Sequence, residues 1–357
     1  MILKVCFLKE DFIMSYIFKN LIFEGGGAKG IAYLGAMEVL KKKGILKNIK
    51  RIGGASAGAI NALLLGLNYS SDKLKEILMD LDFNLFLDDS WGIIRDIKRL
   101  KSEFGWCKGD CFYKWIKDRI KEKTGNPNST FKDIYGIKKE NKFKDIYFIG
   151  ANISTGFAEV YSYEDTPLME VAKAIRISMS IQLFFAAVRK QDNDVCVDGG
   201  LINNYPVKLF DREKYIEVDR RIPEYYKKYN RELKKTSHKN NIWIYNKETL
   251  GFRLDSEKEI AVFRNHKEPS HKDVKDFIDY AFCIISTVFK IQSSMHLHSD
   301  DWKRSIYINT LEVSTFDFDI SKEKKQELIE SGKKCTEDYF NEWYDKLKRS
   351  PNIQKIH

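Results

Sequence analysis

A serine flanked by glycines is the strongest candidate in the chain for a catalytic residue. Residues 54–58 read Gly-Ala-Ser-Ala-Gly, the pattern G-x-S-x-G, where a strand pattern gives way to a helical one. Gly54 and Gly58 fit because larger side chains two positions from the serine would clash in a tight turn. The Ser56 hydroxyl would then stand at the tip of the turn, near the positive end of the helix dipole. The pattern predicts a nucleophile; a turn of small residues without chemistry is the alternative.

Three consecutive glycines earlier in the chain could bring bare backbone close to an anion. The segment EGGGAKG, residues 24–30, holds Gly25, Gly27 and Gly30 in the dinucleotide-binding spacing G-x-G-x-x-G. That fingerprint expects an acidic residue about 20 positions later, where this chain has Lys50 and Arg51. A P-loop would end in Gly-Lys-Ser/Thr, which the segment lacks. Nucleotide binding is therefore a minor alternative, and the sequence favours an oxyanion formed during a reaction.

The glycine segment and the serine turn each follow a predicted strand. If these strands are neighbours in a parallel sheet, their carboxyl ends place the two turns side by side. Backbone amides of the glycines would then point at the carbonyl oxygen that Ser56 attacks. Fixed amides stabilise a tetrahedral oxyanion, and removing one such donor typically costs about 3–4 kcal/mol of barrier. The predicted donors are Gly25, Gly26 and Gly27.

A serine hydroxyl also needs a group that takes its proton. Asp198, in VCVDGGLINNYP, ends a strand pattern and precedes two glycines, so we expect its carboxylate at a strand end, like Ser56. The alternative is an ordinary Asx turn. The chain order of serine, aspartate and a later histidine is also that of α/β-hydrolases, so a Ser-His-Asp triad stays open. The histidines lie mostly among charged residues, at His238, His266, His271, His296, His298 and His357.

The elements that must position these residues alternate between strands and helices. Residues 20–24 and 49–56 have buried-strand patterns, each followed by a glycine-containing turn and a helical pattern, at 31–43 and 57–68. This rhythm predicts a parallel α/β sheet. Further strands are expected at 144–154, 158–163, 194–198, 240–246 and 304–313. Helices are expected at 166–181, at about 272–298 and at the C-terminal end. The segment WGIIRDIKRLKSEFGW predicts a helix that either packs on the domain or faces a membrane.

Composition sets limits on the class of protein. The chain has 357 residues, of which 43% are hydrophobic, and a formal net charge of +10. Positive charge attracts polyanions, either nucleic acid or an anionic membrane, but no nucleic-acid-binding motif accompanies it. The cysteines are scattered without metal-ligand spacing, so we expect reduced thiols and no metal. No segment has the ~18 uncharged apolar residues that a membrane span needs. We expect a cytoplasmic protein peripheral to membranes, with no clear signal peptide and with Met1 or Met14 as the start.

Three motifs in a fixed order carry a family resemblance. EGGGAKG, GASAG and DGGLINNYP resemble the motifs of the patatin-like phospholipases, over roughly residues 18–345 with a divergent stretch at about 210–300. The segment AIRISMSIQLFF is similar to the part of these proteins before the aspartate, although Gln182 or Leu183 stands where proline is common. Glu24 replaces the commoner aspartate before the glycines.

The resemblance implies a three-layer α/β/α sandwich with a mainly parallel central sheet. It also implies a Ser-Asp dyad without a metal or other cofactor, in which Ser56 is the nucleophile and Asp198 is the base. Lys29 would orient the glycine loop or meet a lipid phosphate. The supporting motif residues are Lys29, Gly30, Gly54, Gly58, Gly199 and Gly200.

The expected function is hydrolysis of fatty acyl esters of membrane phospholipids through an acyl-serine, as in a phospholipase of the A type. A Ser-His-Asp esterase and a non-catalytic lipid-binding protein are the alternatives. The expected partners are a phospholipid or another acyl-lipid substrate and, transiently, an anionic membrane surface, with no nucleic acid. The expected organisation is an N-terminal extension at 1–17, a catalytic core at 18–210, an insertion with late strands and helix of the same domain at 211–320, and a C-terminal helical segment at 321–357.

Overall fold

A mainly parallel sheet lies at the centre of the computed structural model, which describes residues 16–86, 100, 102–190, 192–218, 220–233, 242–257, 273–275, 277–295 and 299–344. Within these residues the sheet has eight strands in the order β10-β9-β1-β2-β4-β8-β7, with β5 paired to β4. All pairs from β10 to β4 are parallel, whereas β5, β8 and β7 pair antiparallel. The strands are β1 Asn20–Phe23, β2 Arg51–Ala55, β4 Asp145–Asn152, β5 Phe157–Tyr161, β7 Val188–Arg189, β8 Val195–Asp198, β9 Thr249–Asp255 and β10 Ser305–Asn309. A separate two-stranded sheet pairs β3 Gly105–Cys107 with β6 Leu183–Phe185.

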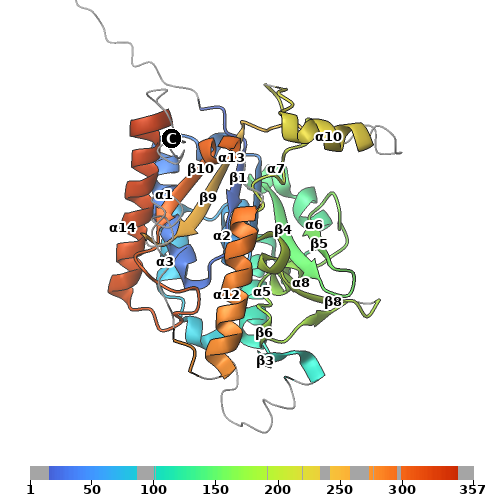
Figure 1. Ribbon diagram of the computed structural model, residues 1–357, viewed down its shortest axis with the longest axis vertical. Helices are drawn as coiled ribbons and strands as arrows, with labels where there is room; N and C mark the ends of the chain where they lie inside the picture. Colours follow the sequence, from blue (N-terminus) through green and yellow to red (C-terminus); the bar gives the residue numbers. More distant parts are fainter. Residues whose placement is uncertain are drawn as a thin grey trace, which may run out of the picture.

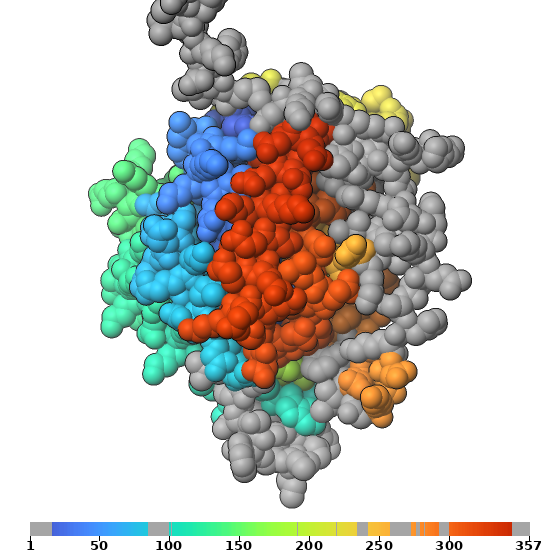
Figure 2. Space-filling model, turned by 90° about the vertical axis from the view of Figure 1, so that its left-hand side faces the viewer, coloured from blue at the N-terminus to red at the C-terminus, as the bar shows by residue number. Residues whose placement is uncertain are grey.

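Helices cover both faces of the sheet (Figure 1). The α-helices are α1 Tyr33–Lys42, α2 Ala57–Gly66, α3 Ser71–Met79, α5 Asp110–Thr124, α6 Phe131–Gly136, α7 Lys138–Asn141, α8 Val171–Ser178, α9 Gly200–Asn203, α10 Glu224–Leu233, α12 Phe277–Met295, α13 Ser299–Lys303 and α14 Lys322–Asp338. Shorter turns are the 3-10 helices η1 Gly27–Ala32, η2 Leu46–Asn48, η3 Phe83–Phe86 and η4 Glu213–Tyr215, and the π-helix η5 Tyr339–Tyr344. Figure 2 shows α14 on the outside of the molecule beside α1 and α3.

Alternating side chains of the strands build a core on each side of the sheet. Leu21 and Phe23 of β1 belong to the larger core, which includes side chains of α1, α2, α8 and α14. Ile22, between them, packs on the opposite face with Tyr147 and Phe210. Successive residues of a strand point to opposite faces, so a buried strand with a core on each side is apolar throughout. The predicted three-layer α/β/α fold class is confirmed, and among the described residues no helix is long and apolar enough to cross a membrane.

The late strands differ from the sequence-based expectation. Residues 240–246 were expected to form a strand, but in their described part Trp243 and Tyr245 make only isolated bridges, with Arg212 and Arg221. The strand next to β1 is instead β9, which the pattern TLGFRLD did not predict because Arg253 and Asp255 suggest solvent. Both side chains are buried, and the Arg253 guanidinium donates to Asp255 at 2.8 Å, so each charge has a partner inside the protein.

Other expected elements are found where the structure describes them. The expected helix at about 272–298 corresponds to α12, and the strand at 304–313 corresponds to β10. Strand β9 joins the sheet beside β1 and β10 pairs with the outer edge of β9, so strands from beyond residue 210 complete this side of the sheet. Residues 91–99 and 101 of the predicted amphipathic helix lie outside the described residues, as do residues 1–15 and 345–357.

Candidate active site

Strands β2 and β8 pair with the same edge of β4, one after the other, and this arrangement positions the residues of the candidate site. The first half of β4 pairs with β2, ending at the pair Ala55 and Ile149. The next residue, Gly150, pairs with Asp198 of the antiparallel strand β8. Strands β2 and β8 therefore run toward each other along the same edge, and their carboxyl ends meet. Ser56, which follows β2, and Asp198, which ends β8, come together for this reason.

Ser56 occupies a strained turn between β2 and α2. Its backbone has φ 51° and ψ −128°, in a region that residues with a side chain rarely adopt. The flanking glycines are needed because a Cβ on Gly54 would lie 2.4 Å from the Gly58 carbonyl carbon, and one on Gly58 would lie 2.4 Å from the Phe23 oxygen. The Ser56 N–H donates to Ser178 Oγ at 3.1 Å, which fixes the turn. This is the geometry that a nucleophile elbow requires.

Asp198 is a buried carboxyl poised between its two protonation states. Burial raises the pKa of Asp198 to about 7, while hydrogen bonds from the Gly200 N–H and the Ser56 hydroxyl lower it. The Gly200 N–H lies 2.6 Å from Asp198 Oδ1. Within the part of the chain that the structure describes, Asp198 Oδ2 has no hydrogen bond of ordinary geometry, and the Ser56 Oγ lies 3.7 Å from Met179 Sδ. The Ser56 hydroxyl is thus close enough to lower the pKa of Asp198, while its own hydrogen bond goes to the sulfur of Met179, which is a weak acceptor.

The glycine loop lies against the serine turn, as expected for neighbouring strands β1 and β2. A Cβ on Gly25 would lie 3.0 Å from Ser56 Cβ, so only glycine lets the two loops come this close. Gly27 has φ +55°, and a Cβ there would lie 2.0 Å from the Thr315 oxygen. The Gly25 N–H, however, donates to the Asn204 carbonyl at 3.1 Å. The Gly25 amide therefore already has a partner in the described structure, and an oxyanion hole formed by Gly25, Gly26 and Gly27 stays a prediction.

Asn204 links the glycine loop to the aspartate loop, a role that the sequence reasoning missed. Its Nδ2 donates to the Gly25 carbonyl at 3.2 Å and to Glu24 Oε1 at 3.4 Å. Glu24 Oε2 in turn accepts from the Leu254 N–H of β9 at 2.8 Å. The only signal in the sequence was the place of Asn204 downstream of Asp198 in DGGLINNYP.

The remaining motif residues hold the loops in place. Lys29 Nζ donates to the Leu254 carbonyl at 3.3 Å, which ties the glycine loop to β9. A Cβ on Gly30 would lie 3.1 Å from Ala57 Cβ, and one on Gly199 would lie 2.2 Å from the Ile149 oxygen. Gly200 is confined between Asp198 and α12, because a Cβ there would lie 3.1 Å from the ring of Phe289. A contact between Lys29 and a lipid phosphate stays a prediction.

The structure does not bear on the histidines of the alternative triad, and it bears on a metal site only within its described residues. The histidines considered for a triad, His238, His266, His271, His296 and His298, lie outside the described residues. In the described ranges no cluster of three histidine, cysteine, aspartate or glutamate side chains could hold a metal ion. The described arrangement, a serine in an elbow turn beside a buried carboxyl and bare glycine backbone, suits attack on an ester carbonyl.

Comparison with known proteins gives matches over most of the chain. The family model described as patatin-like phospholipase matches residues 21–211. The uncharacterized protein YqhO of Bacillus subtilis is 26% identical over 90% of this chain and 98% of its own length. The probable lipid hydrolase 463L of Invertebrate iridescent virus 6 is 27% identical over 54% of this chain and 63% of its own. The crystal structure of VipD from Legionella pneumophila has a TM-score of 0.54 at 18% identity, over 90% of this chain and 66% of VipD, and shows the shared fold.

Proposed function

The chain belongs to the patatin-like phospholipase family, and from this membership we propose that it is a phospholipase of the A type with a Ser-Asp dyad. It hydrolyses a fatty acyl ester of a membrane phospholipid through an acyl-Ser56 intermediate. The family makes it a lipid ester hydrolase; the dyad, the phospholipid substrate and the membrane contact are the proposal. The meeting of β2 and β8 along one edge of β4 is the observation that carries it.

In the first half of the reaction, Ser56 Oγ attacks the ester carbonyl and its proton moves to Asp198. A base with a pKa of about 7 suits this step near neutral pH, because a large fraction is ionised yet still basic enough to accept a proton. The amides of Gly26 and Gly27 stabilise the oxyanion, since the Gly25 amide is already paired. When the tetrahedral intermediate collapses, the lysophospholipid alcohol takes the proton from Asp198 and leaves.

In the second half, water replaces the alcohol. Asp198, again ionised, takes a proton from the water as its oxygen attacks the acyl-Ser56 carbonyl. The bond from the carbonyl carbon to Ser56 Oγ then breaks, the proton returns to Ser56, and a free fatty acid leaves. No metal or cofactor is needed in this cycle.

A lipid substrate is supported by the family and by the relative whose name is probable lipid hydrolase. A net charge of +10 supports transient contact with an anionic membrane surface. Lys29 is proposed to orient the glycine loop through its bond to Leu254.

Release of fatty acid from phospholipid vesicles tests the proposal. Purified wild type should release fatty acid, Ser56→Ala should release none above background, and Ser71→Ala serves as a control serine elsewhere on the surface of the fold. A fluorophosphonate probe should label the wild type and the Ser71→Ala variant but not Ser56→Ala. Equal release or equal labelling of wild type and Ser56→Ala would remove the nucleophile assignment.

A second experiment separates the dyad from a triad. All the candidate histidines, His238, His266, His271, His296 and His298, are replaced together by glutamine. The dyad predicts that the folded variant still hydrolyses phospholipid at a rate near that of the wild type. Loss of activity in a variant whose circular dichroism spectrum and melting temperature match the wild type would favour the triad.

A further inference from the structure

Helix α12 carries apolar side chains on two faces. Ala281, Ile285 and Phe289 recur every four residues and are buried against the protein. On the outer face, Tyr280 is 55% exposed, Ile284 is 47% exposed and Ile291 is 46% exposed. The helix has only Asp279 and Lys290 as charged residues along its sequence FIDYAFCIISTVFKIQSSM. A surface helix of a globular protein normally presents charged and polar groups to water on its outer face, so this composition needs an explanation.

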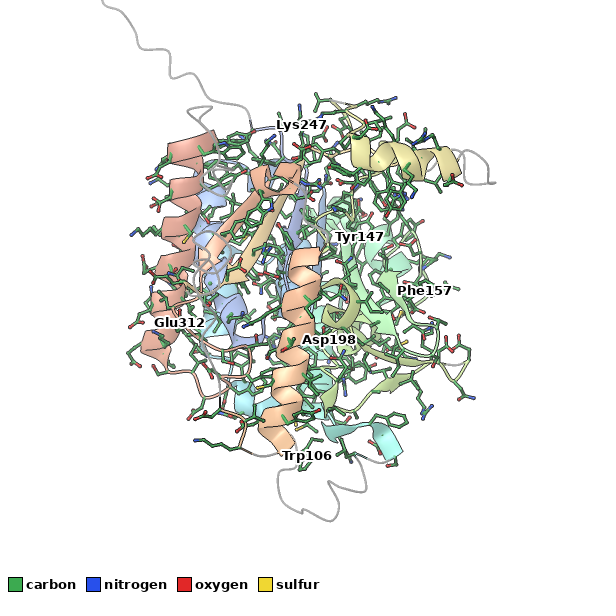
Figure 3. The ribbon with its side chains drawn as sticks, viewed as in Figure 1. Trp106, Tyr147, Phe157, Asp198, Lys247 and Glu312 are labelled. Atoms are coloured by element: carbon green, nitrogen blue, oxygen red, sulfur yellow. The ribbon has the colours of Figure 1, made fainter. Side chains whose placement is uncertain are left out.

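The same helix covers the candidate active site. Its Phe289 lies against Gly200 at the start of α9, two residues after Asp198. Figure 1 shows α12 crossing the front of the molecule, and Figure 3 shows Asp198 at the level of the middle of this helix. Ser56 and Asp198 are both 0% exposed. The Ser56 hydroxyl is closed even to water in this arrangement, so a phospholipid can reach it only after the elements packed over the site move.

We propose that the outer face of α12, defined by Tyr280, Ile284 and Ile291, docks on the surface of a phospholipid bilayer, and that docking moves α12 off α9 to open the site. This inference rests on the proposed function, since a bilayer holds the substrate. A bilayer also offers one environment for the whole face: apolar side chains enter the boundary between headgroups and acyl chains, and the tyrosine hydroxyl stays near water. The positive charge of the chain adds attraction to anionic headgroups.

A second exposed apolar pair supports the same orientation. Phe104 and Leu183 are exposed large hydrophobic residues at the small sheet of β3 and β6, where Gly105 pairs with Leu183. In the view of Figure 1, β3 and β6 lie at the lower end of the molecule, toward which α12 also extends. The next residue before Leu183, Gln182, donates through Nε2 to the Asp198 carbonyl at 3.2 Å, so this edge adjoins the site. A bilayer held at this end would present its lipids next to the proposed dyad.

Vesicle binding tests the docking surface without depending on catalysis. The double variant Tyr280→Glu, Ile284→Glu places two charges on the outer face. Its matched control is Ile153→Glu, because Ile153 is also 47% exposed but lies on the turn between β4 and β5. Sedimentation with vesicles of phosphatidylcholine and phosphatidylglycerol should show binding about tenfold weaker for the double variant and unchanged for the control. Equal binding by wild type and the double variant would overturn the docking surface, and would leave a protein partner as the occupant to seek.

Accessibility of Ser56 tests the opening. Vesicles of ether-linked lipids, which cannot be hydrolysed, should speed fluorophosphonate labelling of the wild type about tenfold, and should speed labelling of the double variant much less. An unchanged labelling rate when wild type binds vesicles would overturn the movement of α12. Failure of the proposed function has a different result: no labelling and no fatty acid release under any condition, with vesicle binding still sensitive to Tyr280 and Ile284.

Discussion

Ionisation of Asp198 should set the pH dependence of acyl transfer to Ser56. Burial raises the pKa of this carboxyl from 3.8 to about 7, and only the ionised form accepts the serine proton. One unit below the pKa about a tenth of the molecules are ionised, and one unit above it about nine tenths are. The rate of acylation should therefore rise about tenfold between about pH 6 and pH 8 and level off above. An aspartate in water, with its ordinary pKa, would give a flat profile over this range.

A soluble ester substrate, assayed with vesicles of ether-linked lipids present at every pH so that the site is open, measures this effect at constant membrane contact. The value of kcat/KM for a short-chain p-nitrophenyl ester, taken in a buffer series of constant ionic strength, reports the pKa of the free enzyme. Asp198→Asn should be slower by about 10²–10⁴-fold and should show no inflection. An imidazole titrates in the same pH range, so the variant without the candidate histidines is the control. The inflection should persist in that variant because it comes from Asp198. A flat wild-type profile between about pH 5.5 and 8.5, or one that falls with pH, would refute the reasoning.

Three further predictions follow from the same contacts. The raised pKa of Asp198 means that the folded state favours the protonated carboxyl, which adds to the free energy of unfolding below about pH 4. This contribution is lost as pH rises through about 7. In urea titrations, the free energy of unfolding of the wild type relative to Asp198→Asn should fall by roughly 4 kcal/mol between about pH 4 and 8. Gly58→Ala places a Cβ 2.4 Å from the Phe23 oxygen and should destabilise the fold by about 3 kcal/mol, whereas Gly136→Ala, whose Cβ would meet no described atom within 4 Å beyond its chain neighbours and its own helix backbone, should leave the melting temperature nearly unchanged. Asn204→Ala removes the bond to the Gly25 carbonyl and should lower kcat about 10–100-fold with little change in KM; a higher KM at unchanged kcat would contradict a positioning role.

Local sequence was sufficient to predict the turns and the fold class. A glycine two positions on either side of Ser56 and three glycines after β1 are requirements of backbone geometry, and they are met within a few residues of chain. The alternation of strand and helix patterns before residue 70 likewise predicted the parallel sheet. These features could be read from the sequence because the forces that fix them act between near neighbours.

Contacts between distant segments could not be predicted in the same way. Strand β9 was missed because the charges of Arg253 and Asp255 suggest solvent, whereas inside the protein Arg253 pairs with both Asp255 and Glu24, which allows the burial of these charges. The Gly25 amide was expected to face the reaction centre, but it donates a hydrogen bond to the carbonyl of Asn204, which lies 179 residues later in the chain. Each result depends on which groups the folded chain brings together.

The sequence by itself determined which residues are proposed to carry the chemistry and which turns can present them: Ser56, Asp198 and the three glycines Gly25, Gly26 and Gly27. Only the tertiary structure decided that β2 and β8 end against each other on β4, that Asp198 is buried deeply enough to have a pKa of about 7, and that α12 lies over the site. The reason is physical: desolvation and strand pairing depend on the whole arrangement of the chain, whereas the strain of a turn depends on a few consecutive residues.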